Sequence, residues 1–277
     1  MNIIRQRGLR IAEFWLDESF EGKDIDVALL KHYNRTPEQA QNEAAWTLNI
    51  DLGQTQDQLL NGMNEVTRYE VRRAQKRDEL TFECIETPTQ AHIDEFALMQ
   101  AEFCRTKGLP NQGVGRAIGM QAQGILRMSR VLLGDQTLVW HVHFEIGDKA
   151  RLLHSNSLFR ATSGACTPSL LSRANRYLHW QDLLWFKQRG RVGYDLGGWY
   201  AGQTDQGLLA INRFKEGLGG AKDIAFDARI ALTAKGRLYE RYQAFKRKIA
   251  LRSFSCCVFM GQYCADHEFM PVVLHGL

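Results

Sequence analysis

Two segments in the last third of the chain carry the residue types best suited to chemistry. Asp195 follows an apolar run and precedes the pair Gly197-Gly198, and Phe214 with Lys215 stands between further glycines. Glycine allows a backbone to approach a ligand closely, and functional residues often lie in segments that follow strands. An aspartate and a lysine at such a place could orient a nucleophile and stabilise negative charge. The alternative is that Asp195 only caps a turn and that Lys215 is a surface lysine in a tight loop.

A basic cluster lies earlier, on a helix expected to begin after the capping-box pattern of residues 55–58. Arg68, Arg72 and Arg73 share the side of this helix opposite its apolar face. That apolar face is expected to comprise Leu59, Met63, Val66 and Ala74. Guanidinium groups bind phosphate through charge-assisted hydrogen bonds, so the cluster could hold a phosphate or another polyanion. The alternative is an ordinary solvated helix face.

His141 and His143 are two residues apart in a strand-like run, so their side chains should point to the same face. No carboxylate follows at a spacing typical of a metal site, and we expect hydrogen-bonded or pocket-lining histidines and no metal. The six cysteines lack paired CxxC spacing and are expected to be reduced packing groups.

Hydrophobic periodicity predicts the elements that position these residues. Strands are expected over 46–52, 80–86, 136–146, 150–159, 191–196 and 224–230, with a hairpin turn at Gly147-Asp148. Helices are expected over 89–107, 114–131, 168–188 and 233–252.

The composition is that of an ordinary soluble globular protein. The 277 residues are 44% hydrophobic and 24% charged, and 35 basic against 31 acidic residues give a net charge of +4. This mild excess lacks the concentrated basic face of a dedicated nucleic-acid binder. Charges near the N-terminus argue against a signal peptide, and the apolar run 253–265 is shorter than the roughly 18 residues that span a bilayer. We therefore expect a cytoplasmic protein without a transmembrane segment.

The two glycine-framed segments, residues 192–198 and 212–220, resemble the signature of FemAB-type acyltransferases. These are relatives of the non-ribosomal peptidyltransferases within the GNAT superfamily. The arginine-rich stretch 68–74 and the helix 178–190 are also similar, so the resemblance covers about residues 46–232. It implies an α+β fold with a mixed, mostly antiparallel sheet flanked by helices on both faces.

The resemblance further implies an N-acyltransferase, which joins an acyl or aminoacyl group to an amine. In such an enzyme Lys215 would stabilise the oxyanion and Phe214 would shape the pocket. Asp195 would orient or deprotonate the amine, and Tyr200 would donate a proton to the leaving group. The remaining residues expected to contact substrate are Arg68, Arg72, Arg73, Gly197, Gly198, Trp199, His141 and His143.

Donor and acceptor follow from the same resemblance. The donor would be an acyl-CoA such as acetyl-CoA, or an aminoacyl-tRNA, although residues 160–165 only loosely resemble a pyrophosphate loop. The acceptor would be a nucleotide-activated or lipid-linked amino sugar of an envelope or polysaccharide precursor, handled in the cytoplasm or at the inner face of the membrane. Alternatives are a catalytically silent GNAT-like binding module and an aminoacyl-tRNA-dependent peptidyl or protein transferase.

Peptidoglycan-type family members usually contain two GNAT-like halves, and this chain has room for one. We therefore expect a first half-domain remnant over 1–45, the acyltransferase domain over 46–252, and a tail over 253–277 that packs on the domain. The chain is expected to be a monomer or a homodimer.

Overall fold

The protein was analysed as a computed structural model. It describes residues 2–6, 8–20, 24–34, 41–108, 111, 113–158 and 166–257. The chain divides into two compact units. One unit combines the residues up to Ala44 with those from Ala225 to the end of the last helix, and the other runs from Ala45 to Ile224. Each unit is described by itself.

The first unit contains strands β1 (Asn2–Gln6), β2 (Leu9–Trp15), β3 (Val27–Tyr33), most of β10 (Ala221–Ala231), and helix α7 (Ala234–Cys257). β1 pairs with β2 and β10 with β3 in antiparallel fashion, whereas β2 and β3 are parallel. Phe14, Leu30 and Ala228 are buried together and form the core of this sheet.

The second unit holds every residue predicted to take part in chemistry. Its strands are β4 (Gln41–Asp51), which begins in the first unit, β5 (Leu80–Ile85), β6 (Leu126–Leu133), β7 (Gln136–Ile146), β8 (Lys149–Ser157) and β9 (Gly193–Gly198). Its helices are α1 (Gln56–Gly62), α2 (Glu65–Arg77), α3 (Gln90–Lys107), α4 (Gly115–Ala122), α5 (Pro168–Gln188) and α6 (Gln206–Gly217).

The strands follow the order β4-β9-β8-β7-β6-β5, and each neighbouring pair is antiparallel except the parallel pair β8 and β9. This parallel pairing runs from Lys149 opposite Gly193 to Arg151 opposite Asp195. Ser155 and Gly198 therefore lie beyond the part of β8 and β9 where these two strands pair with each other, although each still pairs with its other neighbour, β7 or β4.

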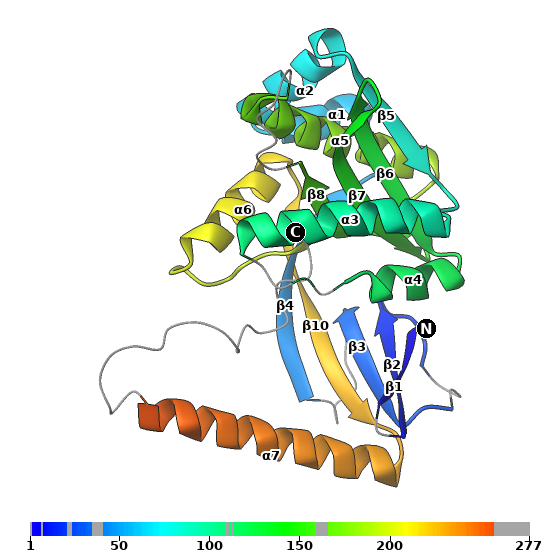
Figure 1. The fold of residues 1–277 in the computed structure, drawn as a ribbon, viewed down its shortest axis with the longest axis vertical. Helices are drawn as coiled ribbons and strands as arrows, with labels where there is room; N and C mark the ends of the chain where they lie inside the picture. Colours follow the sequence, from blue (N-terminus) through cyan, green and yellow to red (C-terminus); the bar gives the residue numbers. More distant parts are fainter. Residues whose placement is uncertain are drawn as a thin grey trace. The chain divides into compact units, whose positions relative to one another are not determined.

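Helices cover both faces of this sheet (Figure 1). His141 on β7 contacts Asp182 of α5, while the ring of His154 on β8 lies 5.6 Å from Phe96 of α3. His154 is opposite Val142, the neighbour of His141 in sequence, and successive side chains of a strand point to opposite faces. The predicted α+β class, with a mostly antiparallel sheet between helices, is confirmed.

Local sequence signals set several boundaries correctly. Thr55 and Gln58 form the predicted capping box at the start of α1. The β7–β8 hairpin turns at Gly147-Asp148, and α5 spans the predicted residues with Thr167 capping its first turn.

Two predictions about helices were wrong. The helix expected over 114–131 ends at Ala122, since Gly124 adopts a left-handed φ of 71°, and β6 then pairs on both sides. The single helical face expected to contain Leu59 and Val66 is broken, because Asn64 caps a new helix and changes the phase. Val66 is therefore exposed.

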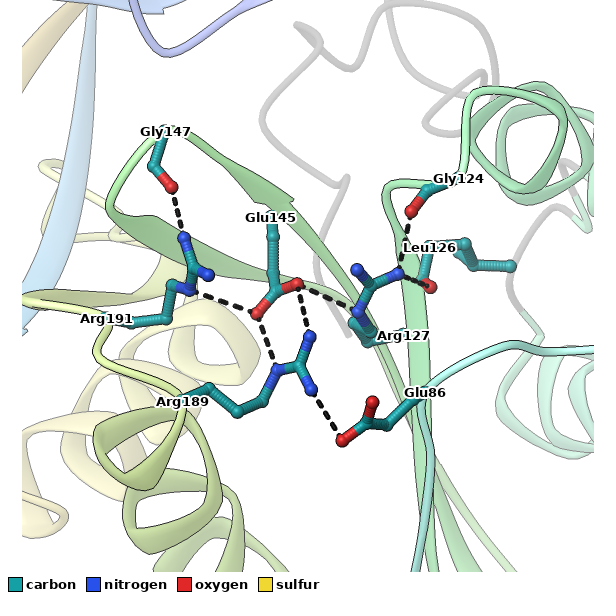
Figure 2. Close-up of polar contacts among 8 residues, drawn as sticks. All are labelled: Glu86, Gly124, Leu126, Arg127, Glu145, Gly147, Arg189 and Arg191. Carbon is teal, nitrogen blue, oxygen red and sulfur yellow. Dashed lines mark hydrogen bonds and ion pairs between the residues drawn. The ribbon is translucent and has the colours of Figure 1, made fainter.

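A cluster of charges ties together the ends of several elements in the second unit (Figure 2). Glu145, at the end of β7, is buried and forms ion pairs with Arg127 at 2.8 Å, Arg189 at 3.0 Å and Arg191 at 3.2 Å. Arg189 also contacts Glu86 at 2.6 Å. The cluster thus joins β6, β7, the end of α5 and the segment entering β9.

The predicted domain boundaries stay a prediction. By contacts, Ala225 to the end of α7 groups with the N-terminal strands rather than with the second unit. The tail from residue 258 and the loop 160–165 lie outside the described residues. Within the described part of the chain, no helix has both the length and the apolar character needed to cross a bilayer.

Candidate active site

Asp195 lies on β9 at the last pair of the β8–β9 ladder and is 5% exposed. One carboxylate oxygen accepts hydrogen bonds from the Thr47 hydroxyl and, at 2.7 Å, from the backbone N–H of Gly197. The other oxygen forms an ion pair with the buried guanidinium of Arg151. Both oxygens are thus occupied by donors from three strand segments.

This environment suits a structural carboxylate more than a proton acceptor. A buried carboxylate that accepts several hydrogen bonds and faces a guanidinium is stabilised in its charged form. Asp195 instead orients the turn at Gly197, since it holds the N–H of that residue. The predicted role of Asp195 in orienting or deprotonating the amine stays a prediction.

The glycine pair after Asp195 approaches the candidate lysine closely. Gly197 has a left-handed φ of 82°, and a Cβ built there would lie 3.7 Å from Lys215 Nζ and 3.6 Å from the carbonyl oxygen of Leu152. The Lys215 ammonium donates a hydrogen bond of 2.7 Å to the carbonyl of Gly198. The two glycine-framed segments thus meet where β8 and β9 cease to pair.

Lys215 is 3% exposed and lies in the last turn of α6, so it is not the surface lysine of a tight loop. Burial lowers the pKa of Lys215 to about 7, with the charge of Arg151 acting in the same direction and that of Asp195 opposing it. One N–H of its ammonium is bound to Gly198. Such a group can supply a positive charge in a water-poor setting and can release a proton near neutral pH.

Phe214 precedes Lys215 in α6, and Trp199 follows Gly198, whose carbonyl accepts the hydrogen bond from Lys215. The Phe214 ring is 5.6 Å from the ring of His179 and 5.0 Å from the guanidinium of Arg176. Trp199 donates a 2.9 Å hydrogen bond to Glu216 of α6. These contacts place two partly buried aromatic rings at the end of α6.

Tyr200 contacts its own loop. Its backbone exchanges two hydrogen bonds with the Asn212 side chain, at 2.9 and 2.7 Å, and its hydroxyl lies 3.3 Å from Thr204. The ring covers Gly202, where a Cβ would lie 2.2 Å from it. The predicted role in protonating a leaving group stays a prediction.

The three arginines of α2 have different surroundings. Arg68 donates to the backbone carbonyls of Asn61 and Met63 and so closes the α1–α2 junction. Arg73 lies 3.8 Å from Asp78, and Arg72 is exposed. Arg68 thus serves the local fold, and a phosphate site on this helix stays a prediction.

His141 and His143 point to the same face, as predicted, and meet a buried carboxylate that the sequence reasoning missed. Asp182 of α5 lies 2.6 Å from His141 Nδ1 and 3.4 Å from His143 Nε2. Burial alone would raise the pKa of Asp182, but the charges and hydrogen bonds of the two histidines outweigh it and lower this pKa. His143 also contacts the Tyr194 hydroxyl at 2.9 Å.

Further polar side chains extend this network. The Ser129 hydroxyl donates to Asp182 at 2.6 Å, and His141 Nε2 is 3.0 Å from both Ser155 Oγ and Asn175 Oδ1. A sequence signal existed, since Asn175, His179 and Asp182 repeat at helical spacing in α5. The partner residues on three strands could be found only from the folded chain.

His141, His179 and Asp182 lie close enough for their ligand atoms to surround an ion. The 2.6 Å separation of His141 Nδ1 and Asp182 Oδ2, however, is that of a charge-assisted hydrogen bond. Burial lowers the pKa of His179 well below its ordinary value, and nearby His141 adds to this effect. The contact between Asp182 and His141 therefore fits a hydrogen bond from Nδ1 of the ring to the carboxylate.

No protein-family model matches the chain, and no curated protein matches it in sequence. Among solved structures, that of FemX superposes with a TM-score of 0.52 and 15% identity, covering 66% of this chain and 61% of FemX. The chain thus shares the fold of FemX over about two thirds of its own length, which confirms the FemAB-like fold predicted from the glycine-framed segments.

Two further structures are similar at lower scores. The C-terminal domain of a putative lysylphosphatidylglycerol synthetase from Agrobacterium fabrum gives a TM-score of 0.48 at 13% identity, covering 76% of this chain and 70% of that one. The L-PGS structure from Bacillus licheniformis gives 0.49 at 11% identity, covering 78% and 72%.

Proposed function

We propose that the chain is an N-acyltransferase that moves an acyl or aminoacyl group to an amine and that Lys215 stabilises the oxyanion of this reaction. One observation carries the proposal: a buried lysine amine lies at the Gly197-Gly198 turn, beyond the last paired residues of β8 and β9. The FemX-like fold supports it, because the segments that meet there are those that resemble FemAB-type acyltransferases.

The chemistry requires a group of this kind. When an amine attacks an ester or thioester, the carbonyl oxygen gains negative charge, and a fixed cation nearby stabilises that state more than the ground state. Lys215 is held in place by Gly198, and its remaining N–H groups can donate elsewhere. Asp195 acts in this proposal as a positioning residue, since it holds Arg151 and the N–H of Gly197.

The substrates are proposed at the level of chemical class. The acceptor is an amine on a nucleotide-activated or lipid-linked amino sugar of an envelope or polysaccharide precursor, handled in the cytoplasm or at the inner face of the membrane. The donor is an acyl-CoA or an aminoacyl-tRNA. Arg72 and Arg73 of α2 supply the positive charge that either phosphate-bearing partner needs.

A donor-resolved transfer assay tests this proposal. The full chain is incubated with acetyl-CoA or with aminoacyl-tRNA, together with UDP-linked amino sugars, and amide products are identified by mass spectrometry. We expect an amide product with one donor class. If no amide forms with any donor while the nucleotide sugar still binds, the chain is a silent binding module and the enzymatic proposal is wrong.

A further inference from the structure

A serine, a histidine and an aspartate from three elements form a hydrogen-bonded line in the second unit. Ser155 of β8 and His141 of β7 are opposite each other across the β7–β8 pair, with Oγ 3.0 Å from Nε2. On the other side of the ring, Nδ1 lies 2.6 Å from Asp182 Oδ2 of α5. We propose that Ser155 is a nucleophile, activated by His141 and Asp182, that accepts an acyl group from an ester or thioester.

The partners determine the proton positions. A carboxylate can only accept, so Nδ1 of His141 carries the hydrogen that faces Asp182. In the neutral ring Nε2 is then an acceptor, and the Ser155 hydroxyl, which lies 3.0 Å from Nε2 and 3.4 Å from Asn175 Oδ1, can donate to it. This is the arrangement in which an imidazole can remove a proton from an attacking hydroxyl.

Neighbouring polar groups hold the aspartate and face the far side of the histidine ring. The Ser129 hydroxyl donates to the second oxygen of Asp182 at 2.6 Å, which holds the carboxylate plane. Asn175 Oδ1 lies 3.0 Å from His141 Nε2 and can accept the hydrogen that this nitrogen gains. Both sides of the imidazolium would thus face an oxygen atom.

The three residues differ in burial. Asp182 and His141 are completely buried, whereas Ser155 is only partly buried. The ring of His179 is 4.3 Å from that of His141 and 5.6 Å from that of Phe214, the neighbour of Lys215. Among the described residues, His179 Nδ1 has no hydrogen-bond partner, so a buried polar atom stands between the line and the lysine region.

The covalent step balances without an added reactant. Ser155 Oγ bonds to the acyl carbon as its proton moves to His141 Nε2, and the bond from that carbon to the leaving oxygen or sulfur breaks. The leaving group takes the proton from His141. An amine then attacks the acyl-serine, His141 removes the amine proton, and Ser155 Oγ recovers it. Only the second step, in which an amine attacks the acyl-serine, rests on the proposed acyl-transfer function.

The test uses p-nitrophenyl acetate as the acyl donor and does not need the natural substrates. The full chain should release a burst of p-nitrophenolate close to one equivalent, with acetyl found on the peptide that contains Ser155. Ser155→Ala should abolish the burst and the modification. Ser157→Ala is the matched control, because Ser157 is two residues further along the same face of β8, and it should behave as wild type.

The activation of Ser155 by His141 and Asp182 is tested with Asp182→Asn, which keeps the shape of the side chain. We expect acetylation of Ser155 to slow at least tenfold, since Nδ1 loses its acceptor. Fluorophosphonate labelling of Ser155 gives a second measurement, and circular dichroism checks folding. Absence of both acetyl and phosphonate on Ser155 in the folded wild type, or equal modification of Ser155 in Asp182→Asn, would overturn the inference.

The two proposals fail separately. If Ser155→Ala loses the burst but wild type forms no amide with any donor, Ser155 is the nucleophile and the proposed transfer to an amine is wrong. If amide transfer proceeds at the wild-type rate in Ser155→Ala, the acyl-serine is not on the transfer path and this inference is wrong.

Discussion

Burial and neighbouring charge set the protonation state of Lys215. Its folded-state pKa of about 7 lies below the ordinary value of 10.5 that the unfolded chain would show. At pH values between these two pKa values, Lys215 binds a proton in the unfolded state but not in the folded state. The free energy of unfolding therefore increases as pH rises. The wild type should therefore gain stability over Lys215→Met from pH 7 toward pH 10, with a slope of up to about 1.4 kcal/mol per pH unit.

Urea unfolding of both chains at pH 7, 8 and 9 measures this difference. If the free energies of unfolding of wild type and Lys215→Met change in parallel with pH, Lys215 has an ordinary pKa in the folded protein. The cation assigned to Lys215 would then be available at every pH tested.

Asp195 and Arg151 form a buried ion pair whose partners depend on each other. Asp195→Asn should lower the free energy of unfolding by about 3 kcal/mol, because an uncompensated guanidinium stays buried. Arg151→Met with Asp195→Asn should lose less than the sum of the single changes. If chemical denaturation shows that the losses in free energy of unfolding are additive, the two groups are independent, and Asp195 does not position Arg151.

At the scale of elements, the Glu145 cluster makes the clearest prediction. Glu145→Gln leaves Arg127, Arg189 and Arg191 without their shared carboxylate, and we expect a loss of about 3 kcal/mol in thermal or chemical unfolding. Glu86→Gln is the control, since Glu86 is exposed and, among the described residues, forms an ion pair with Arg189 only, and it should cost less than about 1 kcal/mol. Equal losses would mean that burial of Glu145 contributes nothing.

The same cluster predicts an acid dependence. Burial raises the pKa of Glu145, but the hydrogen bonds from Arg189 and the charges of Arg127 and Arg191 outweigh it and lower this pKa below its ordinary value of 4.5. A carboxyl group with a lowered folded pKa stabilises the protein above the unfolded value and loses this effect as pH falls. Wild type should therefore lose its advantage over Glu145→Gln below about pH 4.5.

Helix boundaries were predictable from the sequence where contacts between neighbouring residues determine them. The capping box at Thr55 and the Thr167 cap are contacts between near neighbours, so the sequence shows them directly. The segment 114–131 has a helical apolar pattern, yet its second half forms β6, because β5 and β7 provide partners on both sides. Such tertiary pairing overrides a local preference and cannot be seen in one segment.

At the scale of the whole molecule, the candidate site was predictable in part. The glycine-framed segments indicated that Gly197 and Lys215 would lie together, and they do. The Ser155–His141–Asp182 line was not predicted, because its members come from two strands and a helix that meet only in the folded sheet. Asp195 lies on the predicted strand. Its ion pair with Arg151 was not predicted from the sequence.

Acyl transfer with Lys215 stabilising the oxyanion, as proposed above, can be tested on the chain directly. The most direct measurement compares initial rates of amide formation by wild type, Lys215→Met and Lys246→Met, which removes an exposed lysine of α7. The account predicts a loss of about 100-fold or more in kcat for Lys215→Met and none for Lys246→Met. Full activity of a folded Lys215→Met would contradict it.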